Sequence, residues 1–136
     1  MKLVVDANIL FSAIIRNGMT RRLWFHPSAS LSAPAFLLEE ARRHRNEILA
    51  KFGGTEEEFD RLLALLAGQL VLVPDERLKP YLPAAASLSK DSKDWLYLAC
   101  ALCEDAELWS HDKGFLAQRR VRVFSSAELA GMLGEL

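Results

Sequence analysis

Short apolar runs alternate along the chain with longer segments in which apolar residues recur at helical spacing. The runs that predict strands are residues 3–5, 31–33, 70–73, 107–109 and 121–124. The segments that predict helices are residues 7–16, 20–25, 34–52, 55–68, 90–106 and 125–133, with a short helix beginning near residue 113. Because strands that alternate with helices form parallel sheets, we expect an α/β fold with a parallel sheet of about five strands.

Several residues mark the expected helix boundaries. Thr20 can cap the second helix, and Pro34 suits the first turn of the helix that follows the second strand. Thr55 and Ser125 each precede a glutamate by three residues, which is the capping-box spacing. Residues 75–89 are harder to interpret: they suggest one helix, whose length two prolines limit.

Composition narrows the class of protein. The chain has 136 residues, of which 51% are hydrophobic and 26% charged, so we expect one soluble globular domain over residues 1–136. The net charge of −1 means that any nucleic acid must meet locally clustered basic groups. Neither a signal peptide nor an apolar run of membrane-spanning length is evident, and we therefore expect a cytoplasmic protein without membrane contact.

Acidic residues stand near the expected strand–helix junctions. They are Asp6, Glu39 or Glu40, Asp91 with Asp94, and Asp112. Each is also compatible with a structural role: Asp6, Asp91 and Asp112 could cap helices, and Glu40 could pair with His44.

Taken together, the acids predict a metal site. In a parallel sheet these junctions fall on one edge, where ligands bind. Carboxylates gathered there repel one another unless a cation lies among them, and oxygen ligands suit Mg²⁺ or Mn²⁺. Asn8 could orient a water or a phosphate oxygen beside the ion. The sequence has no zinc-type ligand spacing, P-loop, GxGxxG or GxSxG, and Cys100 with Cys103 fits a helix core better than a redox pair.

Four stretches in this order resemble the PIN-domain nucleases, which include the VapC-type toxins of toxin–antitoxin pairs. They are LVVDANIL, APAFLLEEARRH, DSKDWLYLACAL and LWSHDKGF, and together they span nearly the whole chain. The resemblance implies a three-layer α/β/α sandwich with a central parallel sheet. It also implies an endoribonuclease that depends on Mg²⁺ or Mn²⁺ and hydrolyses RNA phosphodiester bonds.

The resemblance also assigns site residues. The metal-binding and catalytic acids that it implies are Asp6, Glu40 (with Glu39 as the alternative), Asp94 and Asp112. Ser110 matches the hydroxyl position two residues before the fourth acid, whereas His111 and Gly114 lie where the family varies; Asp91 is an additional acid. In the implied mechanism, ions held by the acids activate a water that attacks the phosphate in line and expels the 3′-oxygen.

The expected partners follow from local charge and from the resemblance. Arg16, Arg21, Arg22 and Lys113 adjoin the acid-bearing strand ends and are expected to contact phosphates, with Asn8 and Ser110 as further substrate-binding residues. An antitoxin protein and a homodimer are implied by the resemblance alone. Two alternatives are a catalytically silent PIN-fold module that binds RNA or protein, and a phosphoryl-transfer protein of the haloacid dehalogenase or receiver type. The dehalogenase type requires a second aspartate where Asn8 stands.

Overall fold

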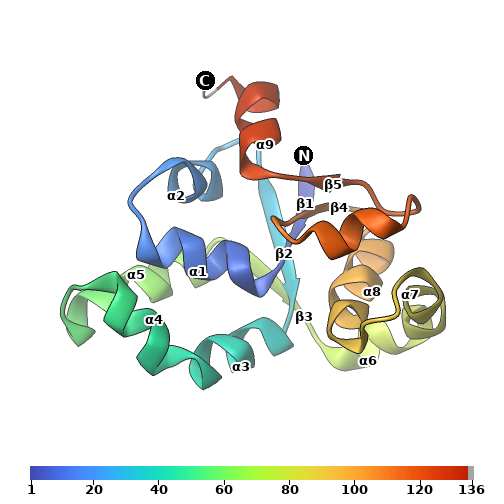
Figure 1. Cartoon of the computed structure of the whole chain (residues 1–136), viewed down its shortest axis with the longest axis horizontal. Helices are drawn as coiled ribbons and strands as arrows, with labels where there is room; N and C mark the ends of the chain where they lie inside the picture. The colour runs from blue at the N-terminus through green and yellow to red at the C-terminus, as the bar shows by residue number, and fades with distance from the viewer. Residues whose placement is uncertain (135–136) are drawn as a thin grey trace.

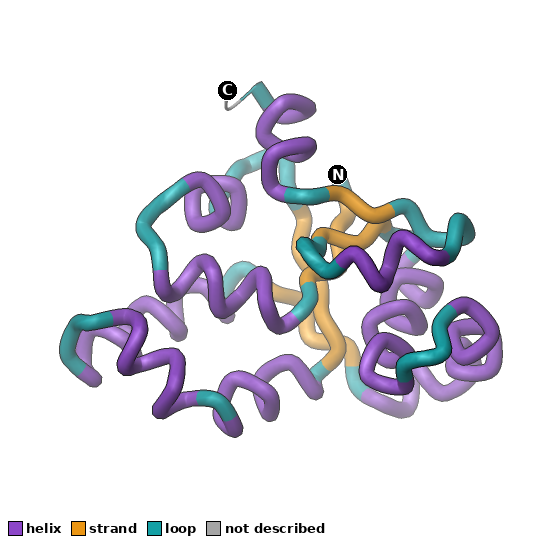
Figure 2. The backbone as a smooth tube through the Cα atoms, in the orientation of Figure 1, coloured by secondary structure: helices purple, strands orange, loops and turns teal. Residues whose placement is uncertain are grey.

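A five-stranded parallel sheet forms the centre of the molecule (Figures 1 and 2). This computed structural model describes residues 1–134. The strands are β1 (Lys2–Val5), β2 (Ser30–Pro34), β3 (Leu70–Val73), β4 (Glu107–Trp109) and β5 (Val123–Phe124). Their order is β3-β2-β1-β4-β5 and every pair is parallel, which confirms the predicted sheet. The chain runs outward from β1 to β3 and returns to β4, so the strand order reverses between β1 and β4.

Helices cover both faces of the sheet, and the three-layer sandwich is confirmed (Figure 1). One face carries α1 (Ala7–Ile15), α2 (Met19–Trp24), α3 (Phe36–Arg43), α4 (Arg45–Phe52) and α5 (Glu56–Ala67). The other carries α6 (Asp75–Leu78), η1 (Lys79–Tyr81), α7 (Leu82–Leu88), η2 (Ser92–Asp94) and α8 (Trp95–Glu104). After β4 comes η3 (Lys113–Ala117), and α9 (Ser126–Leu133) packs against α2.

The core lies on both sides of the central strands. Leu3, Val4 and Val5 of β1 are all buried, as expected for a parallel strand that has helices on both faces. Trp24 and Trp109 are also buried, with ring centroids 6.1 Å apart, and the Trp24 indole N–H donates to the carbonyl of Leu66. The apolar packing therefore fixes the position of β1, from which the candidate site begins.

The single helix predicted over residues 34–52 is wrong in its extent. Pro34 belongs to β2, and the helical segment divides into α3 and α4 at His44. His44 has φ −100° and ψ 12°, outside the helical region, although the hydrogen bond from its N–H to the Glu40 carbonyl is retained. The helix axis therefore changes direction directly after the segment that carries Glu40.

Other boundaries also differ from the sequence predictions. Thr20 lies inside α2, where its hydroxyl contacts Ser126, and Gly18 is the N-cap residue. Residues 75–89 form three short helical segments in place of one, the fifth strand begins at Val123, and the helix predicted from residue 90 begins as η2. Both predicted capping boxes are present, at Thr55 and Ser125.

The structure also describes helix lengths and the environment of the two cysteines. Among residues 1–134, no helix is long and apolar enough to cross a membrane. Cys100 and Cys103 are free thiols within α8, and burial raises the pKa of Cys100 to about 12. A buried thiol with a raised pKa is a poor nucleophile, in keeping with a core position.

Candidate active site

Asp6 occupies the end of β1, beside the strand at which the sheet order reverses. Val5 pairs with Trp109, and the N–H of Asp6 donates to the Trp109 carbonyl, so the next residue of β4, Ser110, lies alongside Asp6. The Ser110 hydroxyl donates to the Asp6 carboxylate, and both side chains are buried. The other Asp6 oxygen accepts the N–H of Ile9 at 3.0 Å and caps α1. Asp6 therefore caps α1 and also lies at the edge of the sheet where ligands bind in α/β folds.

Asp112 follows on the turn after β4. Its N–H donates to the Ser110 hydroxyl oxygen at 2.9 Å, and its carboxylate accepts the N–H of Gly114 at 2.8 Å. The Ser110 hydroxyl therefore connects two acids, since it donates to Asp6 and accepts from the backbone of Asp112. Asp112 is exposed, unlike Asp6.

Ser126 holds this turn from the side of α9. Its hydroxyl accepts the indole N–H of Trp109 at 3.0 Å and lies 2.8 Å from His111 Nε2 and 3.0 Å from the Thr20 hydroxyl. The Ser126 N–H also donates to His111 Nε2, so that nitrogen is an acceptor and the imidazole proton belongs on Nδ1. These contacts anchor His111, which lies between Ser110 and Asp112, to Ser126 of α9 and through it to Thr20 of α2.

Asp94 comes from the opposite helical layer. It ends η2 directly before α8, and only 7% of it is exposed. Its carboxylate accepts the Ser89 hydroxyl at 2.8 Å. Asp91 caps η2 by accepting the Lys93 N–H at 3.0 Å, the structural role considered for it from the sequence.

Glu40 lies on α3 and reaches the same region. The Tyr97 hydroxyl donates to Glu40 Oε1 at 2.6 Å, and Tyr97 is buried. Because Tyr97 is one helical turn after Asp94, the start of α8 presents both residues at the same end of the helix. Glu39 is exposed and does not line this region. His44, considered as a partner for Glu40, lies 3.6 Å from Glu47 instead.

These side chains line one cleft of about 140 Å³. Its polar residues come from four segments of the chain, and they are Asp6, Asn8, Glu40, Asp91, Lys93, Asp94, Tyr97 and Asp112. The cleft lies at the carboxyl ends of β1 and β4, the edge at which open α/β sheets bind ligands.

Negative charge accumulates in the cleft. Burial raises the pKa of Asp6 above its ordinary value, and the nearby Asp112 carboxylate adds to the rise against hydrogen bonds from Ser110 and Ile9. Burial likewise raises the pKa of Asp94, with Asp91 and Asp112 acting in the same direction. Burial and the neighbouring Glu40 raise the pKa of the Tyr97 hydroxyl, which therefore stays a hydrogen-bond donor. A cation bound here would relieve the repulsion.

The donor set fits a hard divalent cation. Carboxylate, amide and hydroxyl oxygens line the cleft, and these are the ligands that Mg²⁺ and Mn²⁺ prefer. Within residues 1–134, however, no three acidic, histidine or cysteine side chains converge as a ready-made metal site. Three of the acids instead accept hydrogen bonds from Ser110, Ser89 and Tyr97. Ion binding would therefore require side-chain reorientation, for which exposed Asp112 has the most freedom.

The basic residues predicted from the sequence lie outside this cleft. Lys113 lines a neighbouring pocket with Ser110 and Asp112, and Arg16 lines a larger groove that borders the cleft. Arg21, also expected to contact phosphates, donates from its guanidinium to the carbonyls of Ala13 at 2.7 Å and Ile14 at 2.9 Å. Arg21 instead satisfies carbonyls in the last turn of α1.

Sequence reasoning missed three residues that contact or accompany the acids. Tyr97 and Lys93 line the cleft, and Ser89 holds Asp94. Tyr97 could have been found from its spacing of three residues after Asp94 on a predicted helix. Ser89 gave no such signal, because residues 75–89 could not be assigned to elements.

Comparison with known proteins identifies the family of this chain. A sequence profile of the PIN domain matches residues 4–124. The chain belongs to the PIN-domain family. PIN domains are generally nucleases that depend on divalent metal ions.

A solved structure shares the fold. It is VapBC2 from Rickettsia felis bound to a DNA fragment from their promoter, with a TM-score of 0.72 and 14% sequence identity. The match covers 92% of this PIN domain and 98% of the other chain. No curated protein matches the sequence.

Proposed function

We propose that this PIN domain is an endoribonuclease that depends on Mg²⁺ or Mn²⁺ and hydrolyses RNA phosphodiester bonds. The observation that carries the proposal is the single cleft that Asp6, Glu40, Asp94 and Asp112 line at the carboxyl edge of the sheet. Four acids from four separate segments have no shared structural need to meet, and their repulsion disfavours the arrangement unless a cation is bound.

Each residue of the cleft has a role in this proposal. Asp6, Glu40 and Asp94 would hold one or two ions, while Asp112 orients the attacking water or shares in holding an ion. The bound ion would supply Lewis-acid polarisation of the phosphate and a lowered pKa for water. Asn8 orients a phosphate oxygen, and Ser110 keeps the Asp6 carboxylate in place through its hydrogen bond. No protein nucleophile is needed, because water attacks the phosphorus in line and the 3′-oxygen leaves.

The basic residues near the cleft would position the substrate. Arg16 and Lys113 are exposed, have no ion-pair partner among residues 1–134, and lie in pockets that share residues with the acid cleft. Phosphate contacts of this kind set the position of a nucleic acid without reading its sequence.

We also propose that the protein is the toxin of a toxin–antitoxin pair and acts as a homodimer in the cytoplasm, with residues 1–136 forming one nuclease domain. The shared fold with a VapBC2 complex supports an antitoxin protein as partner. Residues 135 and 136 lie outside the described part of the chain.

Incubation with a mixed RNA pool tests the nuclease proposal. The protein should cleave RNA with Mn²⁺ and not in EDTA, and Asp94→Asn should lose this activity. Asp105→Asn is the matched control: Asp105 is exposed at the end of α8 remote from the cleft, and its φ of 49° suits asparagine. Equal cleavage by Asp94→Asn and the unaltered protein would contradict the assignment.

A catalytically silent binding module is the second candidate. It is favoured by the internal hydrogen bonds of the acids and by the lack of a ready three-ligand group within residues 1–134. Mn²⁺ should raise the Tm of the nuclease and leave the Tm of a silent module unchanged, because a ligand stabilises only a protein that binds it.

A further inference from the structure

A second cavity borders the acid cleft and is larger than it. This groove lies between α1 and α4 and has a volume of about 470 Å³. It shares two lining residues with the acid cleft, Asn8 and Glu40. A polymer whose reacting phosphate lies in the acid cleft can therefore continue into the groove without leaving the protein surface.

The groove has a lining suited to a nucleotide chain. Phe11, Ile15 and Ile48 supply an apolar floor, and Phe11 packs edge-on against His44 with ring centroids 5.8 Å apart. Arg16 and Lys51 place positive charge at the rim. Single-stranded nucleic acids are held in this way, by cations along the backbone and by aromatic or apolar faces against the bases.

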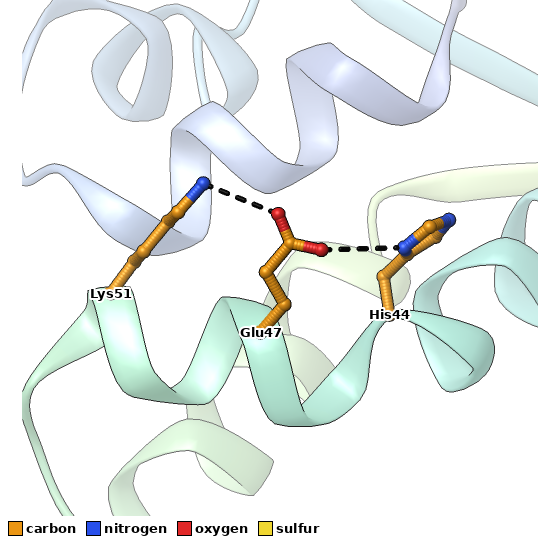
Figure 3. Close-up of polar contacts among 3 residues, drawn as sticks. All are labelled: His44, Glu47 and Lys51. Atoms are coloured by element: carbon orange, nitrogen blue, oxygen red, sulfur yellow. Dashed lines mark hydrogen bonds and ion pairs between the residues drawn. The ribbon is translucent and has the colours of Figure 1, made fainter.

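One acidic residue of the groove, Glu47, disfavours the binding of a nucleotide chain there. Figure 3 shows Glu47 between Lys51 and His44, with all three side chains extending from the α4 segment toward α1. Glu47 lies 3.3 Å from Lys51 Nζ and 3.6 Å from His44 Nδ1. Lys51 and Glu47 are 60% and 62% exposed, so their ion pair is weak and can be exchanged for another anion. Glu47 thus occupies the position on Lys51 that a phosphate would take.

We propose that the groove between α1 and α4 binds the part of a single-stranded RNA next to the cleaved bond, with a phosphate displacing Glu47 from Lys51. The inference rests on the proposed nuclease function and names the path of its substrate. Continuity with the acid cleft and the exchangeable lysine favour RNA over a peptide as the occupant. Glu47 then competes with the substrate, and its charge lowers RNA affinity.

The test measures binding of a labelled single-stranded oligoribonucleotide of about 12 nucleotides in EDTA buffer. Lys51→Gln should weaken binding by about threefold or more, and it should lower the slope of log affinity against log salt by about 0.7. Glu47→Gln should tighten binding by about twofold or more, because it frees Lys51. Lys79→Gln and Glu76→Gln, on the opposite face of the sheet, are the matched controls and should bind as the unaltered protein does.

Opposite shifts in the two α4 variants, with unchanged controls, support the groove as the RNA path. The groove proposal is overturned if Lys51→Gln, Glu47→Gln and the unaltered protein bind the RNA with equal affinity. A protein segment would then be the occupant of the groove. Mn²⁺-dependent cleavage of RNA could still be observed in that case. If the unaltered protein binds no RNA, the groove proposal fails, and the Mn²⁺-dependent cleavage assay decides the proposed function separately. Both substitutions are at exposed positions, and unchanged melting curves confirm that folding is intact.

Discussion

Removing the Ser110 hydroxyl should destabilise the protein by an amount that depends on pH. The hydroxyl donates to the buried Asp6 carboxylate, and the Ser110 side chain is 3% exposed. A hydrogen bond to a charged group contributes about 1.5–3 kcal/mol, whereas a bond to a neutral group contributes about 1 kcal/mol. Ser110→Ala should therefore cost about 2 kcal/mol where Asp6 is ionised, or about 7 °C in Tm for a domain of this size.

The direction of the pH effect follows from the raised pKa of Asp6. A raised folded-state pKa means that the native protein binds the proton more tightly than the unfolded chain, so stability falls as pH rises through that interval. The Ser110 hydrogen bond lowers this pKa, and its removal should steepen the fall. The loss in Ser110→Ala should thus be about 2 kcal/mol near pH 8, and it should shrink toward about 1 kcal/mol as the pH is lowered to 4 and Asp6 takes up its proton.

Urea unfolding in metal-free buffer at the two pH values measures this difference. Ser32→Ala is the matched control, since Ser32 is also buried but has no side-chain hydrogen bond or carboxylate partner among residues 1–134. It should lose little stability at either pH. An equal loss for Ser110→Ala at both pH values, or an equal loss for Ser32→Ala, would refute the electrostatic reasoning.

Three further predictions concern the neighbouring residues. Asp94→Asn should raise the Tm of the metal-free protein at neutral pH, because it removes a buried charge whose pKa is already raised; a lower Tm would contradict this. Tyr97→Phe should cost about 1 kcal/mol in urea unfolding and weaken Mn²⁺ binding in titrations, because Glu40 loses the hydroxyl that holds it; an unchanged Mn²⁺ affinity would count against that role. Arg21→Ala should cost about 1–3 kcal/mol through its two carbonyl partners, whereas exposed Arg22→Ala should cost almost nothing, as equilibrium unfolding of both will show.

Much of the fold could be predicted because it depends on local patterns. The buried run of β1 and the two capping boxes are encoded within a few residues, and the structure contains them. The break at His44 could not be predicted, because the apolar spacing continues across it while the backbone leaves the helical region. The division of residues 75–89 into three short helical segments could not be predicted either, because prolines limit the length of a helix without fixing where each one begins.

In the candidate site, too, the residues that follow from local patterns and topology could be predicted, and those that depend on contacts between elements could not. The acids were found because strand–helix junctions of a parallel sheet share one edge, a property of the topology alone. The residues that hold them were harder to find, because Ser89, Tyr97 and Ser126 act through contacts between elements. The structural role of Arg21 was missed for a related reason: charge density along the sequence does not show that a guanidinium donates to backbone carbonyls.

Mn²⁺ binding followed by calorimetric titration probes the central claim most directly. If the acids that line the cleft act together as ligands, the unaltered protein and Asp105→Asn should bind Mn²⁺ with the same affinity, and Asp6→Asn should lose most of it. Undiminished Mn²⁺ binding by Asp6→Asn, or no binding by the unaltered protein, would contradict the account.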